Sequence, residues 1–346
     1  MALLDIPSPK PDTPAVLIAG THSGAGKTTV TAVLSRELRR RGLTVQPFKV
    51  GPDFIDPGYH GEAAGRRSIN LDVWMMGEEG VRRVFQRWSR DADVAVIEAM
   101  GAVFDGADAT DHGSAAHVAR LLGVPLIVVV DVWGMTRTTA AILQGLIGFD
   151  PDANIAGCVL NRVGSPKHAQ LITTAMPPAL RPMVLGAVPY RRLLEIPERH
   201  LGLLTPQENE VPQETRAAAQ SDAAGDLDID RILELLGVGR AGPAAPPRPI
   251  AGSPTVCRIA IARDDAFCFY YEGNLLALRD AGCEIVPFSP VSDRRLPPGT
   301  DAVYVGGGYP ESFAEELAAN TGLAKEMADR AKAGMPIYAE CGGLMW

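Results

Sequence analysis

AVLIAGTHSGAGKTT, residues 15–29, is the stretch that decides the fold of this chain. Its first six residues are apolar or small, which is typical of a short buried strand, and a glycine-rich turn follows them. KTTVTAVLSRELRRRG, residues 27–42, then has the spacing of an amphipathic helix. A glycine-rich turn between a strand and a helix cradles phosphate oxygens with the N–H groups of the helix N-terminus. We therefore predict a nucleotide-binding P-loop.

The P-loop pattern gives individual residues specific roles in nucleotide binding. Lys27 places positive charge at the β- and γ-phosphates, and the Thr28 hydroxyl is a ligand for Mg²⁺. The strict pattern has glycine where Thr21 stands, and Gly20 comes one place early. Asn161, at the end of a later strand, reads the adenine edge or instead caps the next turn. The residues that we expect to bind ATP are Thr21, Gly24, Ala25, Gly26, Lys27, Thr28, Thr29 and Asn161.

Apolar strands and amphipathic helices continue to alternate along the chain. Strands are predicted at 43–50, 92–100, 125–131, 155–163 and 183–190, and helices at 117–124 and 228–237. This alternation is typical of an α/β domain with a doubly wound, mostly parallel sheet.

A stretch rich in Pro, Gly and Ala, VGRAGPAAPPRPIAGSPT (238–255), interrupts the alternation and indicates a linker. We predict one domain over 1–239, a linker over 240–255 and a second domain over 256–346. In the second domain, strands at 257–264, 283–290, 301–308 and 336–343 alternate with helices at 274–282 and 313–334. That pattern favours part of an open flavodoxin-like sheet.

Composition excludes several classes of protein. The formal charge of −8 argues against a general binder of nucleic acid or anionic membranes. The five cysteines form no C-x-x-C pair, so zinc and disulfide frameworks are not expected. The start of the chain lacks the basic region of a signal peptide, and the longest apolar run, VPLIVVVDVW, is too short for a membrane span. We expect a soluble, cytoplasmic protein.

Acidic residues follow two of the predicted strands. The stretch VIEAMGAVFDG (96–106) contains two acidic residues. Glu98 lies at the end of a buried strand, and Asp105 comes seven residues later. A carboxylate at the carboxyl edge of a parallel strand beside a P-loop is placed to hold Mg²⁺. Asp53 follows the strand at 43–50 and is a second candidate for this edge of the sheet. The alternative is that Pro52 and Asp53 only form a turn.

Longer stretches make the chain recognisable. PFKVGPDFIDPGYH, IEAMGAVFDG, VLNRVGS, RHLGLLTP, YYEGNLLALRDAG, VGGGYPESFAEELAAN and PIYAECGGLMW occur in this order over essentially the whole chain. Together they resemble the cobyrinic acid a,c-diamide synthase family of cobalamin biosynthesis, which includes the hydrogenobyrinic acid and nickel-sirohydrochlorin enzymes. The P-loop is similar to that of the dethiobiotin synthetase-like branch. His22 and Ser23 stand where the partition-ATPase branch carries an extra lysine.

The resemblance implies a carbon–nitrogen ligase that uses ATP, Mg²⁺ and glutamine or ammonia. ATP would phosphorylate a peripheral carboxylate of a corrinoid substrate, and ammonia would displace phosphate from the acyl phosphate. Thr28, Asp53 and Glu98 would hold Mg²⁺, and Lys27 would stabilise charge on the transferring phosphoryl group. The resemblance further places Asp53, Tyr59 and Asp105 near the activated carboxylate, with Asp105 catalytic. Residues 98–103 read EAMGAV where the family usually has EGVMGL, which puts only the local backbone shape in doubt.

The second domain is similar to class I glutamine amidotransferases. Cys341 would be the glutaminase nucleophile, and Gly307 and Gly308 would supply oxyanion donors. The family carries its histidine and its acid further downstream, whereas no histidine follows His200 here. We therefore expect a domain truncated at its C-terminus, as a fragment or as a protein served by free ammonia or a separate glutaminase chain. Ammonium, but not glutamine, would then support the reaction.

Other functions stay open at this point. The nickel-sirohydrochlorin a,c-diamide synthase is the alternative within the family. A partition-type P-loop ATPase regulator is the alternative from another class. The expected partners are a corrinoid substrate and glutamine or ammonia, without nucleic acid or membrane, and a homodimer is one option for assembly.

Overall fold

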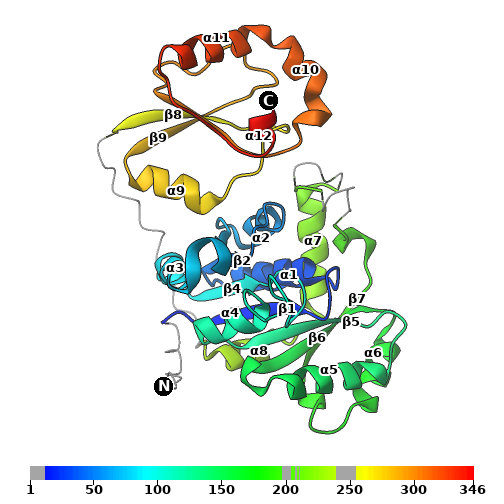
Figure 1. The fold of residues 1–346 in the computed structure, drawn as a ribbon. Helices are drawn as coiled ribbons and strands as arrows, with labels where there is room; N and C mark the ends of the chain where they lie inside the picture. The colour runs from blue at the N-terminus through cyan, green and yellow to red at the C-terminus, as the bar shows by residue number, and fades with distance from the viewer. Residues whose placement is uncertain (1–11, 197–203, 207–208, 210, 239–254) are drawn as a thin grey trace, which may run out of the picture. The chain divides into compact units, whose positions relative to one another are not determined.

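The chain divides into two compact units, Met1–Pro247 and Arg248–Trp346 (Figure 1). The computed structural model describes residues 12–196, 204–206, 209, 211–238 and 255–346. The predicted linker lies outside these residues except for its last position, and the first five residues of RHLGLLTP lie outside them too. None of the helices in these ranges is long and apolar enough to cross a membrane.

A parallel sheet forms the centre of the first unit. In the described part of this unit the strand order is β3-β2-β4-β1-β5-β6-β7, and each neighbouring pair runs parallel. The strands are β1 (Ala15–Gly20), β2 (Val45–Val50), β3 (Ile69–Leu71), β4 (Val94–Glu98), β5 (Leu126–Asp131), β6 (Ile155–Val163) and β7 (Val184–Pro189). β1 and β4 are buried along their whole length, as expected of apolar strands covered on both faces.

Helices lie on both sides of this sheet (Figure 1). They are α1 (Lys27–Arg40), α2 (Asp56–Ala64), α3 (Val73–Ser89), α4 (Ala115–Leu122), α5 (Thr138–Phe149), α6 (Pro166–Ala175), α7 (Gln213–Ala224) and α8 (Ile229–Leu236), with 3₁₀ turns at Pro151–Ala153, Arg181–Met183 and Arg192–Leu194. Apolar residues of α1, α7 and α8 share one buried core with β1, β4 and β5. The prediction of a doubly wound α/β unit is confirmed.

Two elements next to the site carry a weak sequence signal. β3 is three residues long, and α2 contains Pro57, Gly58 and Gly61, which lower its intrinsic helix propensity. Both form because of their tertiary contacts: β3 pairs with β2, and α2 packs against α1.

The second unit contains a smaller parallel sheet. Its described strands follow the order β11-β10-β8-β9. The elements are β8 (Cys257–Ala262), α9 (Glu272–Asp280), β9 (Cys283–Phe288), β10 (Ala302–Val305), a 3₁₀ turn (Pro310–Phe313), α10 (Ala314–Ala319), α11 (Thr321–Lys332), β11 (Ile337–Ala339) and α12 (Gly342–Met345). The prediction of a partial flavodoxin-like α/β unit is confirmed.

Two details of the second unit differ from expectation. The helix predicted over 313–334 is broken at Asn320, whose amide donates to the carbonyls of Pro290 (2.8 Å) and Asp293 (2.7 Å). The apolar stretch PIYA (336–339) predicts a buried strand before Cys341, but β11 lies at the edge of the described sheet, where Tyr338 is 60% exposed.

Candidate active site

The site lies at the carboxyl edge of the seven-stranded sheet. β1 stands between β4 and β5, so the chain leaves β1 at the point where the strand order switches direction. Loops after neighbouring parallel strands meet at such a point. A cavity of about 880 Å³ opens there, and P-loop residues line it together with the ends of β2, β4 and β6 and the segment after β7.

The P-loop has the backbone that phosphate binding requires. Gly26 caps α1 in the left-handed region (φ 92°), and a Cβ atom added there would lie 2.0 Å from Asn161 Nδ2. Lys27 turns back over the loop, with its Nζ 3.5 Å from the carbonyl oxygen of His22. Burial lowers the pKa of Lys27, although the nearby Glu98 carboxylate opposes this. The ammonium group is therefore poorly solvated and ready to exchange its weak contact for phosphate oxygens.

Asn161 braces the P-loop from β6. Its Nδ2 donates to the carbonyl oxygen of Ala25 at 2.9 Å, and the side chain is 5% exposed. The sequence offers two roles for Asn161, adenine recognition or a cap for the next turn. The observed bond is a third one, because it holds the P-loop 136 positions earlier in the chain. Adenine recognition by Asn161 stays a prediction.

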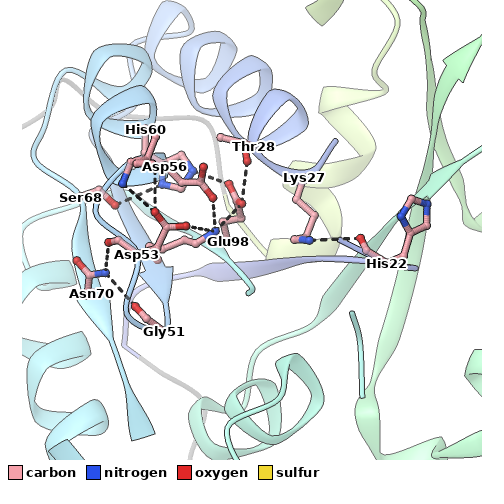
Figure 2. A network of polar contacts seen from close by, with 12 residues as sticks. His22, Lys27, Thr28, Gly51, Asp53, Asp56, His60, Ser68, Asn70 and Glu98 are labelled. Atoms are coloured by element: carbon pink, nitrogen blue, oxygen red, sulfur yellow. Dashed lines mark hydrogen bonds and ion pairs between the residues drawn. The ribbon is translucent and has the colours of Figure 1, made fainter. Parts of the chain in front are cut away.

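Glu98 is the centre of a buried polar network (Figure 2). Its side chain is 1% exposed at the end of β4. One oxygen, Oε1, accepts from Thr28 Oγ1 at 3.0 Å and from Lys49 Nζ at 2.8 Å. The other oxygen, Oε2, lies 2.5 Å from Nε2 of His60 on α2. The carboxylate thus connects the P-loop helix to β2 and α2.

Lys49 is a site residue that the sequence reasoning missed. It lies on β2 in direct register with Glu98 on β4, and its side chain is 2% exposed. Its Nζ also contacts Asp56 and lies 3.3 Å from Asp53 Oδ2. A lysine near the end of a predicted strand, two residues before Gly51 of the turn, was the available signal.

The charges of this network stabilise one another. Burial opposes the charge on Lys49, but the carboxylates of Glu98, Asp56 and Asp53 outweigh it and raise the pKa of Lys49. Burial likewise opposes the charge on Glu98, but Lys49 and then His60 lower its pKa well below the usual range. Both groups therefore stay ionised at neutral pH despite being buried.

Asp53 shapes the turn after β2. Its Oδ1 accepts from the N–H groups of Ile55 (2.8 Å) and Asp56 (3.1 Å) at the start of α2. Asn70 Nδ2 donates to the carbonyl oxygens of Gly51 (3.0 Å) and Asp53 (2.8 Å), which holds the turn from β3. Burial raises the pKa of Asp53, although Lys49 opposes this. Asp53 lines the cavity, and its Oδ2 lies 3.3 Å from Lys49 Nζ.

The predicted metal ligands can be compared with what Mg²⁺ requires. Thr28 and Glu98 present a hydroxyl and a carboxylate oxygen in contact, and Asp53 lines the same cavity. Within the described ranges no group of three or more His, Cys, Asp or Glu side chains could hold a metal ion by itself. Mg²⁺ is commonly bound by one or two protein oxygens together with substrate phosphates, and these residues fit that arrangement.

Two predicted substrate residues lie apart from this network. Tyr59 on α2 is 2% exposed, donates to the carbonyl oxygen of Leu204 at 2.8 Å and accepts from Asn209 Nδ2 at 3.1 Å. Leu204 and Asn209 line the cavity, so Tyr59 holds part of its wall. Asp105 is exposed on the loop after β4 and is not among the residues that line the cavity. Of the three predicted substrate residues, the structure therefore places Asp53 in the network around Glu98, and it places Tyr59 and Asp105 outside that network.

In the second unit, Cys341 occupies a sharp turn between β11 and α12. Its backbone has φ 51° and ψ −122°, a combination that costs energy for a residue other than glycine and is found at functional sites. The thiol is close to Gly307, because a Cβ atom added there would lie 3.3 Å from Cys341 Sγ. The residue is exposed.

The two predicted oxyanion donors differ in availability. The N–H of Gly307 donates to the carbonyl oxygen of Phe269 at 3.2 Å, so it is already engaged. Among the described residues, the N–H of Gly308 has no backbone acceptor. Gly308 also requires glycine, because a Cβ atom there would lie 2.1 Å from the carbonyl oxygen of Ala266. Of the pair, Gly308 is the better candidate.

The fold and the site together define a P-loop nucleotide-binding protein with an attached unit of the glutamine amidotransferase kind. Residues 16–204 match the family described as CobQ/CobB/MinD/ParA nucleotide binding domain. Residues 258–346 match the CobB/CobQ-like glutamine amidotransferase domain.

Curated relatives specify the family further. The cobyrinate a,c-diamide synthase of Syntrophotalea carbinolica is 46% identical over 96% of this chain and 73% of its own length. Proteins of the same name from Leptospira interrogans and Caldanaerobacter subterraneus are 43% and 40% identical, over 96% and 95% of this chain and 72% of their own lengths. The chain belongs to the cobyrinate a,c-diamide synthase family. The solved FtsY structure from Thermotoga maritima (TM-score 0.38, 16% identity, 62% of this chain and 70% of that one) is too distant to carry an argument.

Proposed function

We propose that this protein is an ATP-dependent ligase that amidates the a and c side-chain carboxylates of cobyrinic or hydrogenobyrinic acid. ATP transfers its γ-phosphoryl group to a carboxylate, and ammonia then displaces phosphate from the acyl phosphate. The single observation that supports this most is that Lys27, Thr28, Lys49 and Glu98 line one cavity, in a chain so similar to named cobyrinate a,c-diamide synthases.

The first unit would carry out the phosphoryl transfer by positioning and charge neutralisation. P-loop N–H groups and Lys27 would bind the β- and γ-phosphates. Thr28, Glu98 and Asp53 would hold Mg²⁺, which when bound neutralises charge on the phosphates. Lys49, a buried cation on the cavity wall, would stabilise the charge that spreads over the transferring phosphoryl oxygens. Asp105 and Tyr59 remain candidates for the corrinoid side, although neither lines the cavity.

The second unit would supply ammonia. Cys341 would attack the side-chain amide of glutamine as a thiolate, form a thioester and release ammonia. The Gly308 N–H would stabilise the negative oxygen of the tetrahedral intermediate. The exposed position of Cys341 and its turn geometry support this role.

The test is product formation by the purified protein. With ATP, Mg²⁺, ammonium and cobyrinic acid, we expect mono- and diamide products by mass spectrometry. Lys27→Ala should abolish both, whereas Lys167→Ala, on the exposed side of α6, should leave them unchanged. Cys341→Ser should leave ammonium-driven turnover unchanged and abolish any turnover driven by glutamine.

The acyl phosphate has a test of its own. Cobyrinic acid labelled with oxygen-18 in its carboxylates should transfer label to inorganic phosphate during amidation. Unlabelled phosphate accompanied by diamide would exclude this intermediate while leaving the overall reaction in place.

The alternatives are outcomes of the same assay. Turnover of nickel-sirohydrochlorin in preference to cobyrinic acid would favour the nickel enzyme. ATP hydrolysis stimulated by DNA, without any amide, would instead favour a partition-type ATPase. A cytoplasmic location and a homodimer also stay predictions, and light scattering of the purified protein tests the second.

A further inference from the structure

His60 is a buried polar residue to which the proposed reaction gives no role. It lies on α2, is 0% exposed and points its Nε2 at Glu98 Oε2, 2.5 Å away. Its other ring nitrogen, Nδ1, lies 3.4 Å from Oγ of Ser68, which is 4% exposed just before β3 (Figure 2). The three side chains form a line from Ser68 through His60 to Glu98.

The direction of the hydrogen bonds follows from the groups involved. The ionised carboxylate of Glu98 only accepts, so His60 Nε2 carries the hydrogen and donates. Nδ1 faces the Ser68 hydroxyl, which can either donate or accept. These two contacts fix the rotation of the ring.

The two oxygens of Glu98 consequently have separate tasks. Oε2 is engaged by His60, while Oε1 points toward Thr28 and Lys49 on the cavity side. The terminal torsion of a glutamate is broad, so a carboxylate held by one oxygen alone would rotate. Two oxygens held by groups on α1, β2 and α2 leave it one orientation.

We propose that His60, supported by Ser68, is a positioning residue that orients the Glu98 carboxylate for Mg²⁺. This inference rests on the proposed function to the extent that Mg²⁺ with a nucleotide is the group that Glu98 serves. Partners that hold a metal ligand in place commonly change metal affinity or activity by about 10–100-fold when they are removed.

Lys49 and His60 engage different oxygens of Glu98. Lys49 contacts Oε1 at 2.8 Å and also pairs with Asp56, whereas His60 is the partner of Oε2. Burying a further polar ring beside it costs free energy unless each ring nitrogen is hydrogen-bonded, and both nitrogens face a polar partner here. An apolar residue would fill the same space if packing were the only requirement.

The experiment measures metal binding directly, without a corrinoid. Mn²⁺ replaces Mg²⁺ as a spectroscopic probe, and its binding in the presence of ADP is followed by electron paramagnetic resonance. ADP affinity in EDTA, measured by calorimetry, is the metal-independent reference. Unfolding by urea reports stability separately.

Four variants of the full chain separate positioning from packing. His60→Leu fills the space without a donor and should weaken Mn²⁺ binding by about 10–100-fold, with ADP affinity in EDTA unchanged. His60→Gln keeps a donor and should recover most of that loss. Ser68→Ala removes the outer partner and should weaken Mn²⁺ binding by about fivefold. The matched control His117→Leu removes a histidine of α4 that pairs with Glu78 and should leave Mn²⁺ binding unchanged.

Distinct results would overturn the proposal. Wild-type Mn²⁺ affinity in His60→Leu, with lower stability alone, would assign His60 to packing. If His60→Leu does not fold, a Ser68→Ala variant that binds Mn²⁺ as tightly as wild type would refute the proposal. Failure of the proposed function is separable: a wild type that binds Mn²⁺ with ADP but forms no diamide refutes the ligase and leaves the role of His60 intact.

Discussion

Replacing Lys49 by methionine tests the charge network most directly. The substitution shortens the side chain by only one heavy atom and removes a cation that contacts Glu98, Asp56 and Asp53. Three carboxylates then remain close together with no ammonium among them, and Glu98 stays fully buried. We expect a large loss of stability in the first unit.

The magnitude follows from the geometry. At the effective dielectric constant of about 20 that suits such sites, the 2.8 Å separation of Lys49 Nζ and Glu98 Oε1 corresponds to about 6 kcal/mol of attraction, and the 3.3 Å separation from Asp53 Oδ2 to about 5 kcal/mol. The cost of desolvating Lys49, which the variant no longer bears, offsets several kcal/mol of this. Removal of one partner from a buried ion pair typically costs about 3–5 kcal/mol, and we expect a loss in this range.

The assay is urea unfolding in EDTA without nucleotide, so that no ligand contributes to stability. Fluorescence of the first unit's Trp74, Trp88 and Trp133 reports the transition, and Lys167→Met is the exposed control, expected within about 0.5 kcal/mol of wild type. In the double variant Lys49→Met/Glu98→Gln, loss of the unpaired charge should restore about 1–3 kcal/mol. A single variant within about 1 kcal/mol of wild type, or strictly additive effects in the double variant, would refute the reasoning.

Three further predictions concern single residues. Asn161→Ala removes the 2.9 Å bond to the P-loop and should weaken ATP binding by roughly tenfold in calorimetry; unchanged affinity would show that the loop holds its shape unaided. Burial raises the pKa of the Cys158 thiol to about 12, above the unfolded value of about 8.5. The stability that comes from burying the neutral thiol is therefore complete below about pH 8.5 and is lost as the pH rises toward 12. Near pH 8 iodoacetamide should therefore label the exposed Cys341 and spare Cys158 in the folded protein, and peptide mapping that finds both labelled equally would contradict this. Gly308→Ala places a Cβ atom 2.1 Å from a backbone oxygen and should destabilise the second unit by roughly 2–3 kcal/mol in chemical denaturation. Gly322→Ala should change stability little, because its added Cβ atom would come no closer than 3.7 Å to the carbonyl oxygen of Arg294.

Some differences between expectation and structure have a common cause. The helix break at Asn320 depends on carbonyl groups about 30 residues earlier in the chain, which local periodicity does not contain. The exposure of Tyr338 depends on which strand lies at the edge of the sheet. The resemblance places Asp105 near the activated carboxylate, but the path of the loop after β4 leaves Asp105 exposed and outside the residues that line the cavity.

The amino-acid sequence by itself determined the P-loop, the alternating α/β order and the family. Each of these is encoded in contiguous residues: a strand, a glycine-rich turn and a helix are neighbours along the chain, and the family motifs are short words read in order. Only the tertiary structure decided which side chains share the site. Lys49 meets Glu98 because β2 and β4 pair in one register, and a shift by one residue would point the lysine to the opposite face of the sheet. His60 reaches the same carboxylate because α2 packs beside that pair, and such juxtapositions across 38 and 49 residues depend on packing that no local pattern specifies.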